Sequence, residues 1–128
     1  MRLTRTAAAL AASIAFGLTA VAAAGPSPFT GVWKSTDTDG SSQTLMIGGG
    51  PPGAPHVQYF DDLATSCGEP FSSATATGSG AISGMTMTVT LSVRCHNGSP
   101  NPGATVTYTY DPATNTVGDT FGVVWSRP

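Results

Sequence analysis

The sequence predicts an all-β domain, an antiparallel up-and-down barrel of seven or eight strands, with a β-sandwich as the alternative. Residues 85–95 alternate apolar and polar side chains, the pattern of a strand with one dry and one wet face. Clusters of Gly, Pro, Asn and Asp divide the chain after residue 25 into short segments. The first and last of these segments resemble each other, which favours pairing of the two chain ends.

The first 24 residues have the three-part pattern of a secretory signal peptide. Arg2 and Arg5 precede the apolar stretch Ala7–Val21, and the small residues Ala22–Ala24 suit a cleavage site. No later window is long and apolar enough for a membrane span. We therefore expect cleavage after Ala24 and one secreted β domain over residues 25–128, extracellular or periplasmic, without a membrane span.

The expected strands are separated by residues that favour turns. Asp39-Gly40 is typical of a hairpin turn, and the Gly- and Pro-rich run 48–55 excludes regular structure. Residues 62–70 are expected to form a loop or a single helical turn that carries Cys67. The strands expected between these and similar breaks are Gly31–Thr36, Gln43–Ile47, His56–Asp61, Phe71–Gly80, Met85–Cys95, Thr105–Tyr110, Thr116–Thr120 and Phe121–Arg127.

Threonine fills the polar positions of two expected strands. Because threonine suits a pleated, half-buried surface, we expect these rows to form the wet outer face of the sheet. A flat hydroxyl array that binds ice or carbohydrate is the alternative interpretation. The threonines concerned are Thr86, Thr88, Thr90, Thr105, Thr107 and Thr109.

The two cysteines, Cys67 and Cys95, are predicted to form a disulfide. An exported chain meets an oxidising environment, where an even pair of cysteines usually forms a bridge. Only His56 and His96 could join them as metal ligands, and there is no C-x-x-C spacing. In the chain-entropy model, closing a loop of about 29 residues contributes about 3–4 kcal/mol of stability.

The two ends of the domain favour a barrel over a sandwich. Residues 29–35 and 121–127 carry Trp33 and Trp125 in similar apolar surroundings. Apolar segments make poor sheet edges because an unpaired edge recruits other chains. Pairing the first strand with the last removes both edges at once.

The opening hairpin resembles that of the calycin barrels, the lipocalin and avidin type. The resemblance lies in Thr30-Gly31-Val32-Trp33, followed by Gly40-Ser41 and by Leu45 and Ile47. It implies a Gly-x-Trp, here Gly31 and Trp33, on the first strand. It also implies that a basic side chain of the last strand, here Arg127, packs over that tryptophan.

Charge and motif content indicate few kinds of chemistry. Charged residues make up 9% of the chain, and beyond residue 24 only Lys34, Arg94 and Arg127 are basic, so we expect no nucleic-acid partner. We find no catalytic constellation and expect neither an enzyme nor a cofactor. Asp37 and Asp39 resemble the start of a calcium loop, but Gly48 stands where the loop needs Glu, so a turn is favoured over a metal site.

The aromatic residues suggest a binding function. An eight-stranded barrel is just wide enough to be filled by side chains or to hold one small ligand. We expect a non-catalytic binding protein whose interior holds a small apolar ligand. The alternative is a structural or surface-interaction module with a filled core and a cell-surface partner; the oligomeric state is not predicted. The candidate ligand-binding side chains, all expected to point inward, are Trp33, Tyr59, Met85, Met87, Tyr108, Tyr110 and Trp125.

Overall fold

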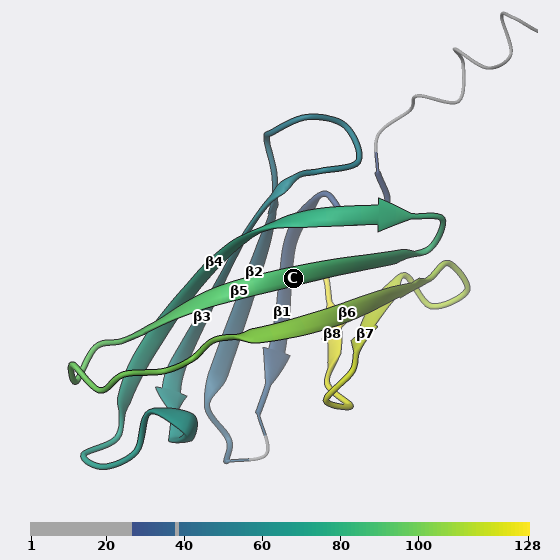
Figure 1. Ribbon diagram of the computed structural model, residues 1–128. Helices are drawn as coiled ribbons and strands as arrows, with labels where there is room; N and C mark the ends of the chain where they lie inside the picture. Colours follow the sequence, from purple (N-terminus) through teal and green to yellow (C-terminus); the bar gives the residue numbers. More distant parts are fainter. Residues whose placement is uncertain (1–26, 38) are drawn as a thin grey trace, which may run out of the picture.

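A computed structural model describes residues 27–37 and 39–128 and contains a closed antiparallel barrel (Figure 1). The expected signal peptide, residues 1–24, lies outside the described residues. A single 3-10 turn, η1 (Thr65–Cys67), follows the third strand. The strands are β1 (Gly31–Thr36), β2 (Ser42–Gly48), β3 (His56–Ala64), β4 (Ser72–Ser83), β5 (Thr86–Cys95), β6 (Ala104–Asp111), β7 (Thr116–Asp119) and β8 (Val124–Ser126).

Each strand pairs with the next along the chain, and β8 returns to pair with β1. The closing contact is short: Lys34 of β1 lies opposite Ser126 of β8. In Figure 1 the yellow β8 runs beside the purple-blue β1. The prediction of an up-and-down barrel is confirmed, with eight strands, and the sandwich alternative is excluded.

Several strand boundaries differ from the sequence-based expectation, and β3 for example continues to Ala64. β4 continues to Ser83, whereas β8 begins only at Val124. Phe121 therefore lies in the β7–β8 turn and is 68% exposed. β5 begins at Thr86, which leaves Met85 in the β4–β5 turn with 51% of its surface exposed. The prediction that Met85 points inward is wrong, because alternation sets the side of the sheet and the barrel ends before the alternation does.

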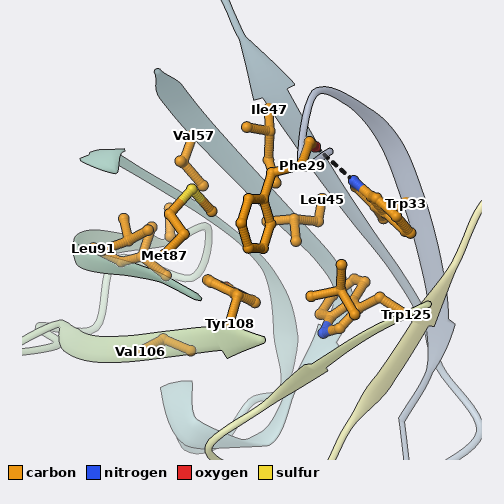
Figure 2. Packing of buried hydrophobic residues seen from close by; sticks show 13 residues of the cluster. Phe29, Trp33, Leu45, Ile47, Val57, Met87, Leu91, Val106, Tyr108 and Trp125 are labelled. Atoms are coloured by element: carbon orange, nitrogen blue, oxygen red, sulfur yellow. Dashed lines mark hydrogen bonds between the residues drawn. The ribbon is translucent and has the colours of Figure 1, made fainter. Parts of the chain in front are cut away.

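One end of the barrel, which we call the closed end, is filled by aromatic side chains. Phe29 precedes β1 and is fully buried there (Figure 2). The Trp33 Nε1–H donates a hydrogen bond of 2.8 Å to the Phe29 carbonyl oxygen. The Tyr110 ring meets the rings of Phe29 and Trp33 edge-on, at centroid distances of 6.3 and 6.4 Å. These contacts fix the segment before β1 inside the barrel.

Arg127 covers the closed end from outside. Its guanidinium carbon lies 4.0 Å from the centre of the Trp33 ring, and Nη1 and Nη2 donate to the carbonyls of Thr30 and Pro28. Gly31 leaves room for this arrangement, because a Cβ there would overlap Arg127 Nη1. The φ of Gly31, +132°, also lies in the region that favours glycine. The packing of Arg127 over Trp33 that the resemblance implied is present.

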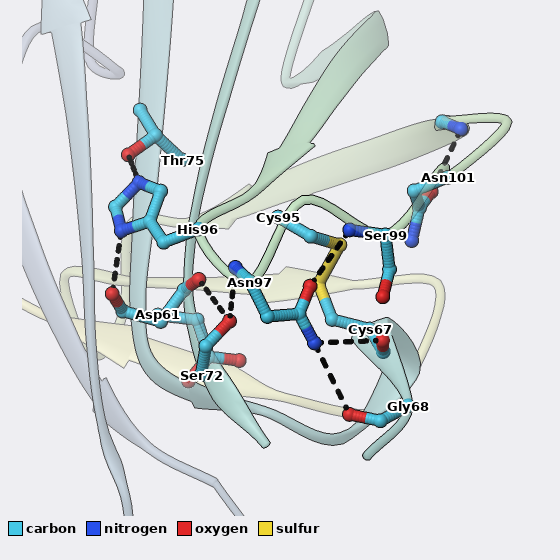
Figure 3. Close-up of a disulfide and its surroundings, with 12 residues drawn as sticks. Asp61, Cys67, Gly68, Ser72, Thr75, Cys95, His96, Asn97, Ser99 and Asn101 are labelled. Atoms are coloured by element: carbon cyan, nitrogen blue, oxygen red, sulfur yellow. Dashed lines mark hydrogen bonds between the residues drawn. A yellow bond between two sulfur atoms is a disulfide. The ribbon is translucent and has the colours of Figure 1, made fainter. Parts of the chain in front are cut away.

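The predicted disulfide joins Cys67 of η1 to Cys95 at the end of β5, with 5.7 Å between their Cα atoms (Figure 3). Asn97 reinforces the same junction. Its Nδ2 donates to the carbonyls of Pro70 and Cys67, at 2.7 and 3.2 Å. The loop after β3 is therefore tied both covalently and by hydrogen bonds to the loop after β5.

The threonine rows lie side by side on the barrel wall, as the alternation predicted. In the register of β5 and β6, Thr88 pairs with Thr107 and Thr90 pairs with Thr105. The hydroxyl oxygens of the two pairs are 3.3 and 3.2 Å apart. These hydroxyls bond to each other across the exposed face of the sheet.

Candidate ligand cavity

A cavity of about 550 Å³ occupies the other half of the barrel. We call this half the open end. Its rim comes from four connections: the β1–β2 turn, η1, the β5–β6 loop and the β7–β8 turn. The disulfide and Asn97 hold two of these connections together, so the rim is braced by the contacts of Figure 3.

The predicted ligand-binding residues divide between the two ends of the barrel. Tyr59, Tyr108 and Trp125 line the cavity. Trp33 and Met87 lie in the buried core and Tyr110 packs against it, and these three do not line the cavity. Their role as ligand-binding residues stays a prediction. Figure 2 shows Trp33 beside Phe29 and Met87 packed among apolar side chains. The alternation of side chains along each strand correctly predicted that these residues point inward. It could not predict that Phe29 fills the space near Trp33, because Phe29 lies before β1.

A buried polar network forms one wall of the cavity. Asp61 Oδ2 accepts a 3.0 Å hydrogen bond from the Tyr59 hydroxyl and a 3.4 Å bond from Gln43 Nε2. Gln43 Nε2 also donates to the Tyr59 oxygen at 3.1 Å. Asp61 Oδ1 accepts from the Leu63 backbone N–H at 3.1 Å and from the Ser41 hydroxyl at 3.2 Å. The Asp61 carboxylate is thus held in place by donors on both oxygens.

Gln43 has one atom that this network does not use. Its side chain lines the cavity and only 5% of the residue is exposed. Within residues 27–37 and 39–128, Gln43 Oε1 is the buried side-chain polar atom that has no hydrogen-bond partner. A buried acceptor left unpaired costs about 1–3 kcal/mol, and a donor that reached Oε1 would remove this cost.

A second carboxylate positions the cavity tryptophan. Asp119, the last residue of β7, accepts a 3.0 Å hydrogen bond from Trp125 Nε1 through Oδ2. Its Oδ1 accepts from the backbone N–H groups of Phe121 and Val123, at 2.8 and 3.0 Å. Asp119 therefore fixes both the β7–β8 turn and the indole ring. The Trp125 ring also meets Tyr59 edge-on, at a centroid distance of 6.0 Å.

The two cavity tyrosines are held in their neutral form. Burial raises the pKa of Tyr59, and the nearby negative charges of Asp61 and Asp37 raise that pKa further. Burial also raises the pKa of Tyr108, with a further contribution from Asp119. The cavity is therefore an environment that opposes additional negative charge.

Asp37 and residues 39–41 make hydrogen bonds typical of a turn. The Gly40 N–H donates to the Asp37 carbonyl, and Asp39 Oδ1 accepts from the Ser41 N–H at 2.8 Å. The hydrogen bonds from Ser41 lower the pKa of Asp39. Among the described residues, no group of three or more His, Cys, Asp and Glu side chains is arranged to hold a metal ion. The backbone geometry agrees with the hairpin turn that the sequence favoured.

His96 lies outside the barrel and contacts two hydroxyl groups. Its Nδ1 is 2.6 Å from Ser73 Oγ and its Nε2 is 3.0 Å from Thr75 Oγ1 (Figure 3). A catalytic serine needs a histidine whose second nitrogen is oriented by a third group, usually a carboxylate. Both ring nitrogens of His96 face hydroxyls instead, so this cluster does not have that arrangement.

The sequence did not identify Gln43, Asp61 and Asp119 as cavity residues, although alternation contains a signal for each. Gln43 lies on the same side of β2 as the buried Leu45 and Ile47. Asp61 and Asp119 likewise lie on the sides of β3 and β7 that carry buried residues. A polar residue at an inward position near a strand end is therefore the pattern that identifies the cavity wall.

Comparison of the chain with protein-family models, with curated proteins and with solved structures gives no match. In the part of the chain that the structure describes, no helix is long and apolar enough to cross a membrane.

Proposed function

We propose that this chain is a secreted, non-catalytic binding protein of calycin type that holds one small, largely apolar molecule in the open end of its barrel. The observation that supports this most is the cavity of about 550 Å³ lined by Tyr59, Tyr108 and Trp125. Small-molecule sites are typically cavities of about 300–1,000 Å³ with apolar and aromatic walls and a few fixed polar groups. The rigid network around Asp61 supplies such groups.

The calycin assignment is supported by the closed end. The Gly31, Trp33 and Arg127 arrangement matches what the opening-hairpin resemblance implies, and the eight-strand meander agrees with it. Export is supported by the residue pattern before position 25 and is compatible with the Cys67–Cys95 disulfide. A surface-interaction module with a filled core is the competing function, and it predicts no uptake of a small molecule.

The proposal is tested by titrating the protein with N-phenyl-1-naphthylamine, a neutral apolar probe that fluoresces more strongly outside water. We expect saturable enhancement for the wild-type chain. Ala104 lines the cavity, so Ala104→Phe should fill part of it and weaken probe binding about ten-fold or more.

Ala81→Phe is the matched control, because Ala81 is an exposed residue of β4. This variant should bind the probe as the wild type does. Circular dichroism and thermal melting check that both variants are folded. Absence of saturable binding to the wild type, or equal binding by a folded Ala104→Phe variant, would contradict the proposal and favour the surface-interaction module.

A further inference from the structure

In the cavity wall, the nitrogen and hydroxyl donors are already used within the protein, whereas one oxygen acceptor has no partner. Gln43 Nε2, the Tyr59 hydroxyl and Trp125 Nε1 all donate within the protein. Gln43 Oε1 is buried and has no partner. A ligand that brings a hydrogen-bond donor to this atom would remove the cost of its burial.

The charges around the cavity all have one sign. Asp37, Asp61 and Asp119 line it, and no described lining residue is Lys, Arg or His. The basic side chains of the described residues lie elsewhere: Lys34 is exposed on β1 and bonds to Thr44, Arg94 is exposed on β5, and Arg127 covers the closed end. A cleft lined by one sign of charge attracts ligands of the opposite sign.

The aromatic wall suits the same kind of ligand. A cation near the face of Trp or Tyr is attracted by the ring quadrupole. Tyr59 and Trp125 are fixed edge-on to each other beside the Asp61 network, and Asp119 anchors the indole nitrogen. The walls can therefore contact an apolar body while the carboxylates stabilise a positive group at one end of it.

We propose that the ligand is an organic cation, an aromatic or apolar body that carries a protonated primary amine directed toward Gln43 Oε1. The carboxylates of Asp37, Asp61 and Asp119 provide the compensating negative charge. Asp61 acts mainly through its field, because both of its oxygens already accept protein hydrogen bonds. This inference rests on the proposed function and names the ligand class for the same cavity.

The test compares three probes of similar shape by isothermal titration calorimetry at low ionic strength. They are 2-(1-naphthyl)ethylammonium, the neutral 2-(1-naphthyl)ethanol and the anionic 3-(1-naphthyl)propionate. We expect the ammonium to bind about ten-fold more tightly than the alcohol, and the propionate to bind most weakly. Added salt should reduce the difference between the charged probes.

Two variants locate the preference within the cavity. Gln43→Met removes the open acceptor at similar volume, and Asp37→Asn removes one negative charge from the rim. Each should lower the affinity for the ammonium about three-fold or more relative to the alcohol. Asp62→Asn is the matched control, because Asp62 is the exposed neighbour of Asp61 and its change should leave both affinities unaltered.

The outcomes separate this inference from the proposed function. If the alcohol binds as tightly as the ammonium, the ligand class is wrong while the binding function stands. An ammonium preference that persists unchanged in both Gln43→Met and Asp37→Asn would also overturn it. If none of the three probes binds, the binding function and the inference fail together.

Discussion

Arg127 links the two ends of the described chain through single-residue contacts. It stacks on Trp33 and donates to two carbonyls of the segment before β1, which includes the buried Phe29. The β1–β8 ladder itself is short, with one residue pair in register. The side chain of Arg127 therefore supplements a closure that has little backbone pairing.

Replacing Arg127 tests this contribution. Arg127→Ala removes the stacking and both hydrogen bonds, and we expect the free energy of unfolding to fall by about 1–2 kcal/mol. Urea unfolding followed by tryptophan fluorescence measures the change. Arg94→Ala, at an exposed position of β5, is the control and should change the stability much less. Equal stability of the wild type and Arg127→Ala would show that closure depends on the ladder alone.

At the scale of elements, the disulfide joins two connections that form part of the cavity rim. Cys67 ends the 3-10 turn after β3, and Cys95 ends β5. The long β4–β5 hairpin between them already brings these residues close, because Ala74 lies opposite Cys95 in the register. The disulfide thus adds a restraint where the strands end and the loops of the rim begin.

The double variant Cys67→Ser and Cys95→Ser should lower the free energy of unfolding by about 3–4 kcal/mol, since the unfolded chain gains freedom in a loop of about 29 residues. Chemical denaturation of the variant and of the oxidised wild type gives the difference. The wild type measured with a reductant is an independent check and should lose a similar amount. An unchanged unfolding midpoint would contradict a stabilising role for the bridge.

The strands were largely predictable from the sequence, because turn residues and the alternation of apolar and polar side chains are local properties. Turn residues gave the breaks, and alternation gave the side of the sheet on which Trp33, Tyr108 and Trp125 lie. The position of each inward side chain along the barrel axis was not predictable in this way. It depends on strand tilt and stagger and on how Phe29 fills the closed end, and this is why Met85 is exposed and Trp33 does not line the cavity.

The cavity wall was harder to predict than the fold. Gln43 and Asp61 are brought together because β2 and β3 pair with Gln43 opposite Asp61. That register is a long-range property that the local pattern of a single strand does not contain. Alternation in the sequence indicates that Gln43 and Asp61 point inward. Only the pairing of β2 with β3 shows that their polar groups form a hydrogen bond with each other.

For the whole molecule, the barrel combines a packed half with a hollow half. Phe29, Trp33 and Arg127 stabilise the closed end, while Asp61, Asp119 and the disulfide fix the walls and rim of the open end. Small-molecule sites are usually largely formed before the ligand arrives. Both tryptophans are buried in the core, and Trp125 also lines the cavity whereas Trp33 does not.

These two tryptophans give the most direct measurement of ligand uptake. In a ¹H–¹⁵N spectrum their indole N–H signals can be followed together as the neutral 2-(1-naphthyl)ethanol is added. The Trp125 signal should move and saturate, because its indole lines the cavity, while the Trp33 signal stays near its starting position. A Trp125 signal that does not move at high probe concentration would contradict the account.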